Sequence, residues 1–316
     1  MKEFTLDGSK FDLSTYSGRF ENALDVVDPR IILASDADIA ESRLKLEEFK
    51  AGKRTESDES LWHAKKILDG ATNPGTGDTI LPPFRMAAFV PFNIPIVAGM
   101  LNTTTVAGTV FWQWFNQSFN SATNYQNRSG SDMSTGQIAK SYGIAVGLSC
   151  GLALSFRWLG MNGPQLFKRI SQIPFVVPYI AVGGAGAANV YFSRQPEIEN
   201  GVMVKDKHGN DVGVSKVAGK QGVMMTIASR SLGLPIPVLI LPTAIMACVP
   251  KTLPKRTLML AELLVITGSL YIGLPAALAM FPQQMEMDAT SLEPEFHDLI
   301  DKDGNPITKL YSNKGM

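Results

Sequence analysis

Five stretches of this chain contain no Asp, Glu, Lys or Arg, and they limit its fold more than any other feature. They lie between Arg85 and Glu286 and cover residues 86–127, 141–156, 170–193, 231–250 and 263–285. A helix needs about 20 predominantly apolar residues to cross roughly 30 Å of hydrocarbon. Most of the stretches approach or exceed that length. The sequence therefore predicts an all-α polytopic membrane protein with about five transmembrane helices.

The overall composition conceals this pattern. The 316 residues include 29 bases and 29 acids, and the mean hydropathy is +0.06, as in an ordinary soluble protein. However, residues 85–281 hold only 6 acids, whereas residues 1–84 hold 16 and the last 35 residues hold 7. We expect three parts: a soluble helical N-terminal region at 1–83, a membrane domain at 84–281 and a polar C-terminal tail at 282–316.

Proline or glycine occurs in every predicted span. The spans are expected at about 84–105, 141–159, 173–192, 232–249 and 258–281. Pro91 and Pro95 each remove a backbone donor, so we expect the first span to be broken there, and both prolines are candidate hinges. Gly143, Gly147 and Gly151 predict a close helix contact. Transporters use discontinuous helices to expose half-helix ends to substrate, although membrane helices are in general rich in Gly and Pro.

Residues 108–128 predict an amphipathic helix with an unusual polar face. That face carries amides at steps of four, three, four and three residues, which is the helical period: Gln113, Gln117, Asn120, Asn124 and Asn127. Asn116 widens the same face. An ordinary interfacial helix carries Lys or Arg instead. Amides donate and accept hydrogen bonds, so the face suits either a neutral polar ligand or buried contacts between helices.

Five further polar residues are candidates for a substrate path. Asn93 and Asn189 lie within predicted spans and could supply polar contacts. Arg85 and Arg194 each stand at the end of a charge-free stretch, where an arginine either binds a carboxylate or extends to the headgroups. Glu262 lies inside the predicted last span, where an acid is a functional candidate unless it reaches the interface.

The soluble parts predict simple elements. Residues 30–70 are expected to be largely helical, with Ser35 or Asp36 as a cap and a Glu41–Lys45 pair. Residues 201–216 alternate around a Gly-Asn turn and predict a small hairpin between spans three and four.

The sequence offers no pattern for several other classes of function. Neither the two cysteines nor the three histidines have the spacing of a metal site, and no cofactor motif or catalytic constellation is present. No basic run or aromatic platform indicates nucleic acid. We therefore expect no cofactor, no metal, no nucleic-acid partner and no enzyme activity.

Several segments together resemble one family. FWQWFNQSFNSATNY at 111–125 is joined by DPR at 28–30, NPGTGD at 73–78, LPPFRMAAFVPFNIP at 81–95 and ALAMFPQ at 277–283. These resemble the sideroflexins, carriers of the mitochondrial inner membrane, and the C-terminal segment is similar to those of fungal members. The resemblance implies five membrane helices, no cleaved presequence, and transport of serine and other small neutral amino acids for one-carbon metabolism. It also implies two alternatives, a tricarboxylate carrier and a link to iron homeostasis.

The chain departs from the family at one motif. Where the family usually has HPDTGE, Asn73, Gly75 and Asp78 replace the His, Asp and Glu. A proton-relay or metal role of this motif is therefore not expected here. Pro74, Thr76 and Gly77 persist, which favours a conformational role just before the first span.

The charge inventory favours a neutral amino acid as cargo. A tricarboxylate would require several bases within the spans, and the charge-free stretches contain none. A non-transporting inner-membrane scaffold remains an alternative, and homo-oligomers remain open. With five spans, the basic loops lie on the side of the N-terminus, which the positive-inside rule places in the matrix and the C-terminus in the intermembrane space. Those loops contain Arg157, Lys168, Arg169, Lys251, Lys255 and Arg256.

Overall fold

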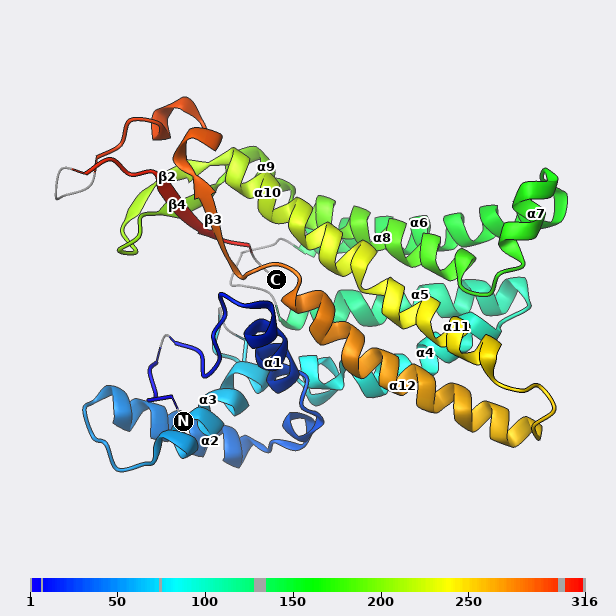
Figure 1. The fold of residues 1–316 in the computed structure, drawn as a ribbon, viewed down its shortest axis with the longest axis horizontal. Helices are drawn as coiled ribbons and strands as arrows, with labels where there is room; N and C mark the ends of the chain where they lie inside the picture. Colours follow the sequence, from blue (N-terminus) through cyan, green and yellow to red (C-terminus); the bar gives the residue numbers. More distant parts are fainter. Residues whose placement is uncertain (1, 7, 74–75, 128–134, 301–304, 315–316) are drawn as a thin grey trace.

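The computed structural model describes residues 2–6, 8–73, 76–127, 135–300 and 305–314, which form an elongated helical bundle with a helical region and a small sheet at one end (Figure 1). Four helices in this described part are long and apolar enough to cross a membrane. They confirm the predicted helical polytopic fold. They span Ile138–Asn162, Val176–Ser193, Lys216–Cys248 and Lys255–Ala279.

We call these four long helices the rods of the bundle. The third rod begins earlier in the sequence than the span predicted at 232–249. It comprises α10 (Lys216–Thr226), two π-helical segments (Ile227–Gly233 and Ile236–Ile240) and α11 (Leu241–Cys248). The other rods are α6 (Thr135–Asn162), α8 (Val176–Ser193) and α12 (Lys255–Ala279), with the short α7 (Gln165–Ser171) between α6 and α8.

The first predicted span is a shorter, continuous helix. Residues 82–88 form two 3₁₀ turns, and α4 runs from Phe89 to Asn102. At 1.5 Å per residue its 14 residues reach about 21 Å, less than the hydrocarbon thickness. Pro91 lies in the first turn, where no N–H partner is required, and Pro95 lies inside the helix. The expectation of a break at these prolines is therefore wrong.

The amide-rich segment forms α5 (Val106–Gln126), which runs antiparallel along α6. Trp114 Nε1 donates to the Tyr142 hydroxyl at 3.1 Å, and the Cys150 thiol lies 3.8 Å from the carbonyl of Val110. Since α5 returns the chain to the end at which α4 began, α6 starts from the same end as the N-terminal region (Figure 1).

This return changes the topology expected from five spans. Both the N-terminal region and the C-terminal strands lie at one end of the bundle, and α1 (Tyr16–Val26) contacts the end of α12, where Arg19 Nε donates to the carbonyl of Ala279 at 2.9 Å. The α7 loop and the loop before α12 lie at the opposite end (Figure 1). The expectation that the basic loops share a side with the N-terminus is therefore wrong.

The glycines of α6 do not mark a helix contact. A Cβ added at Gly143, Gly147 or Gly151 would meet nothing within 4 Å. The close approach lies instead between α8 and the π-helical segment, where a Cβ on Gly186 would lie 3.2 Å from the Ser231 hydroxyl. Glycine spacing along one helix does not reveal which face its neighbours cover.

The C-terminal segment is not a free tail. The strands β1 (Val202–Lys205) and β2 (Asp211–Ser215) form the predicted hairpin, with Gly209 at φ +83° in its turn. β3 (Gln284–Asp288) and β4 (Lys309–Asn313) complete an antiparallel sheet of order β2-β1-β4-β3. Alternate side chains such as Met285, Met287 and Leu310 are buried beneath it. This period of two is masked in the sequence by the charged residues of the opposite face.

Lys314 follows β4 and is buried at the end of the bundle. Burial, together with the nearby Arg230, Arg194 and Arg19, lowers the pKa of its ammonium to about 8. Between pH 8 and 10.5 the unfolded state binds more protons than the folded state, so this lysine makes stability rise with pH.

Lys314→Met should raise the free energy of unfolding at pH 7 by about 1 to 3 kcal/mol. The gain should vanish near pH 10.5 when melting is followed in detergent; a gain independent of pH would contradict this account.

The N-terminal region packs three helices, α1, α2 (Asp36–Lys50) and α3 (Asp58–Ala71), beside the start of α4. Ser35 is the cap of α2 and forms a capping box with Asp38, and Lys45 pairs with Glu41 at 2.8 Å; both features were predicted. α9 (Gln195–Asn200) links α8 to the sheet.

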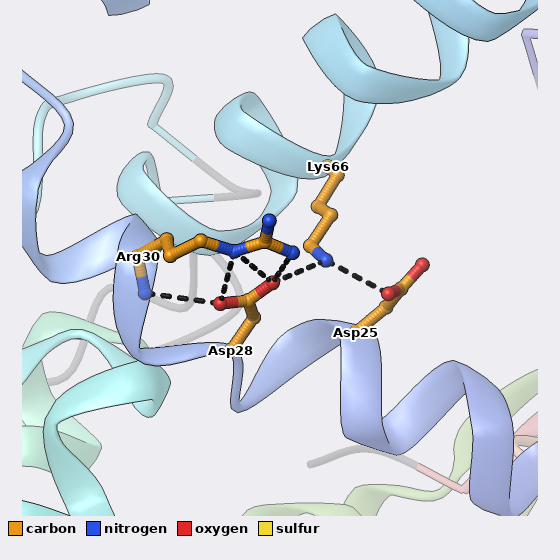
Figure 2. A network of polar contacts seen from close by, with 4 residues as sticks. All are labelled: Asp25, Asp28, Arg30 and Lys66. Atoms are coloured by element: carbon orange, nitrogen blue, oxygen red, sulfur yellow. Dashed lines mark hydrogen bonds and ion pairs between the residues drawn. The ribbon is translucent and has the colours of Figure 1, made fainter.

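The DPR segment holds this region together (Figure 2). Asp28 accepts hydrogen bonds from Arg30 Nη2 at 2.5 Å and from Lys66 Nζ of α3 at 2.7 Å, and Lys66 also binds Asp25 of α1 at 2.8 Å. The Arg30 guanidinium holds the pKa of Asp28 well below its usual value. The network therefore stabilises the region at neutral pH and weakens as acid protonates Asp28.

Candidate functional site

A pocket of about 130 Å³ lies among four helical elements of the bundle: α4, α5, α8 and the π-helical part of the third rod. Its polar lining comprises Asn93, Asn116, Gln117, Asn120, Asn189, Arg230 and Ser231. Gly186 and apolar residues complete it: Phe89, Val97, Met100, Val182, Val190, Leu234, Pro235, Val238 and Leu239. Five of the ten candidate path residues chosen from sequence are thus brought together from three different helices.

The amides of α5 face inward because the aromatic residues occupy the other side. Asn116 and Gln117 are almost completely buried, whereas Phe111 and Trp114 are exposed toward the surroundings of the bundle. Gln117 Nε2 donates to the Ser149 hydroxyl of α6 at 3.4 Å. The amide face therefore agrees with both interpretations of its sequence. One part of it lines the pocket, and another part makes buried contacts between α5 and α6.

Asn116 carries a donor without a partner. Its carbonyl accepts from Asn120 Nδ2 at 3.3 Å, but its own Nδ2 has no hydrogen-bond partner among the described residues, and the side chain is 3% exposed. An unmade hydrogen bond in a buried site costs about 1 to 3 kcal/mol, so such groups are rare outside functional sites. This donor is available to a molecule in the pocket.

Arg230 is the charged residue that the sequence reasoning missed. It lines the pocket, and it forms no hydrogen bond or ion pair with the residues that the structure describes. It stands directly before the charge-free stretch 231–250, the same signal that drew attention to Arg85 and Arg194. Pro235 and Pro237 remove helix donors just beyond it, and there Leu234 N bonds to the carbonyl of Ser229, five residues back. Such π-helical turns occur often at functional sites.

Arg85 does not reach the pocket. Its buried guanidinium donates to four backbone carbonyls at 2.8 to 3.1 Å, those of Ile31, Ile32, Ala34 and Ile80. It therefore fastens the N-terminal region to the segment that leads into α4. The prediction that it binds the carboxylate of a cargo is not supported, because Nε and Nη1 donate to backbone carbonyls and the residue does not line the pocket.

Arg194 is likewise a structural residue. Its guanidinium binds both carboxylate oxygens of Glu197, at 2.6 and 2.8 Å, and donates to the Thr226 hydroxyl and the carbonyl of Lys314. It joins the end of α8 to α10 and to the C-terminal strand. It does not line the pocket, so its sequence assignment to the substrate path is also corrected.

The remaining path candidates lie elsewhere or outside the described residues. Glu262 accepts from Asn102 Nδ2 at 2.6 Å and joins α12 to the end of α4. Gln113 accepts from the Ser149 hydroxyl at 2.7 Å in the α5–α6 contact. The side chain of Asn124 is not among those described.

The loop of the NPGTGD motif is closed by its first residue. Asn73 Oδ1 accepts from Thr76 N at 3.0 Å, and Gly77 has φ +73°, a conformation that favours glycine. Asn73 Nδ2 also donates to the carbonyl of Gln126 at the end of α5, at 2.7 Å. Pro74 lies outside the described residues. The hinge role expected for Pro74, Thr76 and Gly77 stays a prediction.

A larger hollow of about 510 Å³ opens beside Asp25 and Lys66 of the N-terminal region. Its lining mixes acids and bases, and it lies away from the spanning rods. The pocket at Arg230, by contrast, is lined by residues of the helical bundle itself.

Comparison with known proteins gives a single family. The sideroflexin family model matches residues 5–316. The chain belongs to the sideroflexin family. It is 40% identical to a sideroflexin of Dictyostelium discoideum, over 98% of this chain and 96% of that protein. It is 38% identical to Sideroflexin fsf1 of Schizosaccharomyces pombe over the whole of both chains, and 35% identical to human Sideroflexin-5 over 99% and 93%. No solved structure matches this sideroflexin.

Proposed function

We propose that this sideroflexin carries serine, and other small neutral amino acids, across the mitochondrial inner membrane and so supplies one-carbon metabolism. The observation that carries the proposal is the amide-lined pocket among the rods of the bundle. Amides can donate to a carboxylate or hydroxyl and accept from an amine, so one lining serves every polar group of such a cargo. The resemblance to the family supports the same conclusion.

The pocket size argues against the tricarboxylate alternative. Its volume of about 130 Å³ is near that of engineered cavities of roughly 150 Å³ that bind benzene. Serine has about as many non-hydrogen atoms as benzene, whereas citrate has roughly twice as many. Citrate also brings up to three negative charges, and Arg230 is the one charged residue among the lining residues described.

The other two alternatives find less support. For iron handling, the described residues that line the pocket offer amides and one guanidinium, and they lack the carboxylate, imidazole or thiolate ligands that iron prefers. For a scaffold, a buried unpaired donor such as Asn116 Nδ2 lowers stability without serving any packing role.

We infer the orientation in the inner membrane from the basic loops. The α7 end and the loop before α12 lie at the end of the bundle opposite the N-terminal region (Figure 1). These segments contain Arg157, Lys168, Arg169, Lys251, Lys255 and Arg256. The positive-inside rule then places that end in the matrix and the N-terminal region in the intermembrane space. This reverses the orientation expected from five spans, because α5 adds a passage. Protease protection of tags at both ends in mitoplasts tests it: protection of both would contradict it.

Uptake by liposomes tests the function. Purified protein should take up labelled serine, and Gln117→Ala or Asn120→Ala should lower uptake about three- to tenfold, the equivalent of one lost hydrogen bond to the cargo. Asn162→Ala is the matched control, since that amide is exposed at the end of α6 and bonds only to its own helix. Normal uptake by both pocket variants would refute the role of the amide face, and uptake of citrate in place of serine would favour the tricarboxylate alternative.

A further inference from the structure

The electrostatic character of the pocket is one-sided. Arg230 is positively charged, and the described lining residues include no acid to balance it. The charged groups that act on Arg230 from other elements, Arg194 at the end of α8 and Lys314 after β4, are cations as well. The acid nearest in sequence to this cluster, Glu197, is engaged by Arg194 through both carboxylate oxygens. An arginine in this setting is stabilised when an anion enters beside it.

One buried hydrogen-bonding group of the pocket also calls for an acceptor. Asn116 Nδ2, on α5, is a buried donor without a described partner, and it lines the same pocket as the Arg230 guanidinium on the third rod. The acceptor of that amide, Asn116 Oδ1, is already used by Asn120. The pocket thus offers a cationic donor and a free neutral donor. A carboxylate is the small group whose oxygens satisfy both, since a guanidinium binds it with two parallel hydrogen bonds.

We propose that Arg230 and Asn116 bind the carboxylate of the cargo and that no charged group of the pocket recognises its amine. The inference rests on the proposed function only in taking serine as the cargo. It leads to a specific expectation. A small monocarboxylate without an amine, such as 3-hydroxypropionate, should occupy the pocket as serine does, whereas ethanolamine, which is serine without its carboxylate, should not.

Competition in liposomes tests this directly on the unaltered, full-length protein. With labelled serine as tracer, 3-hydroxypropionate should inhibit uptake at concentrations within about tenfold of those at which unlabelled serine does, and ethanolamine should need at least about a hundredfold more. Inhibition by ethanolamine but not by 3-hydroxypropionate would overturn the inference, since the amine would then be the recognised group.

Arg230→Gln provides the second arm, with Arg256→Gln as the matched control at the exposed start of α12. The KM for serine should rise at least about tenfold in Arg230→Gln, and Arg230→Lys should recover part of the loss. A merely structural arginine would lower the melting temperature when replaced. Here the ligand-free Arg230→Gln protein should melt at the same or a higher temperature, because a half-buried cation beside other cations is removed. An unchanged KM for serine would overturn the assignment, whether or not the melting temperature falls.

Thermal melting with ligand separates this inference from the proposed function. In detergent, 3-hydroxypropionate should raise the melting temperature of the unaltered protein and leave those of Arg230→Gln and Asn116→Asp unchanged, the latter because its carboxylate repels that of the ligand. If this pattern appears but liposomes take up no serine, the function proposed above fails and the carboxylate site stands. If serine is taken up but 3-hydroxypropionate neither competes nor shifts melting, the carboxylate site fails and the transport function stands.

Discussion

Arg85→Met should separate the N-terminal region from the bundle and lower the free energy of unfolding by about 3 to 5 kcal/mol, since each buried acceptor left without its donor costs about 1 to 3 kcal/mol. The guanidinium donates to four carbonyls from the turn at residues 31–34 and from Ile80. Without it those carbonyls stay buried and lose their charged donor. Thermal melting in detergent and limited proteolysis of the N-terminal region would measure the effect.

The matched control for that substitution is Arg43→Met. Arg43 donates a single exposed hydrogen bond to the carbonyl of Gly77, and surface changes of this kind usually alter stability by less than about 0.5 kcal/mol. If Arg85→Met left melting unchanged but abolished serine uptake, Arg85 would return to the substrate path, as the sequence first suggested.

Gly186→Leu should fill the pocket and reduce serine uptake by about ten- to a hundredfold, the equivalent of about 1.4 to 2.8 kcal/mol of lost cargo binding. Gly186 lines the pocket, and its added Cβ would already lie 3.2 Å from the Ser231 hydroxyl. The remaining leucine atoms would occupy space that the cargo requires. Uptake by liposomes containing equal amounts of folded protein is the measurement.

Gly268→Leu on α12 is the control for this change. A Cβ added at Gly268 would meet nothing within 4 Å, so the same leucine has room there. Uptake should stay near that of the unaltered protein. Equal, full uptake by both variants would show that the cargo does not pass through the pocket at Arg230.

The two arginines of these experiments show how far sequence reasoning reached at the site. Arg85 and Arg230 both border charge-free stretches, and nothing in their immediate sequence distinguishes a guanidinium bound by carbonyls from one that faces a pocket. The turn at Ile31–Ala34 that engages Arg85 lies about fifty residues earlier in the chain. The amide face was more informative because the helical period alone placed Asn116, Gln117 and Asn120 together.

The elements of the fold also fall into two groups: those that the local sequence determines and those that depend on contacts between distant segments. Long charge-free stretches determine membrane helices whatever their neighbours, since burying charge in hydrocarbon is costly. The path of α5 depends on its packing against α6, and so do the number of passages and the side of the membrane on which each loop lies. The strands at 284–288 and 309–313 likewise formed only by pairing with each other and with the distant hairpin at 202–215.

By itself, the sequence determined the family, the helical membrane architecture, the hairpin, the cap at Ser35 and the amide face of α5. Each of these depends on local period, local charge or a contiguous motif. Only the tertiary structure decided that the N-terminal region and the C-terminal strands lie at one end, that Arg85 and Arg194 bind within the protein, and that Arg230 faces the pocket. The physical reason is that a buried charge takes its role from partners distant in sequence, and those partners are chosen by packing.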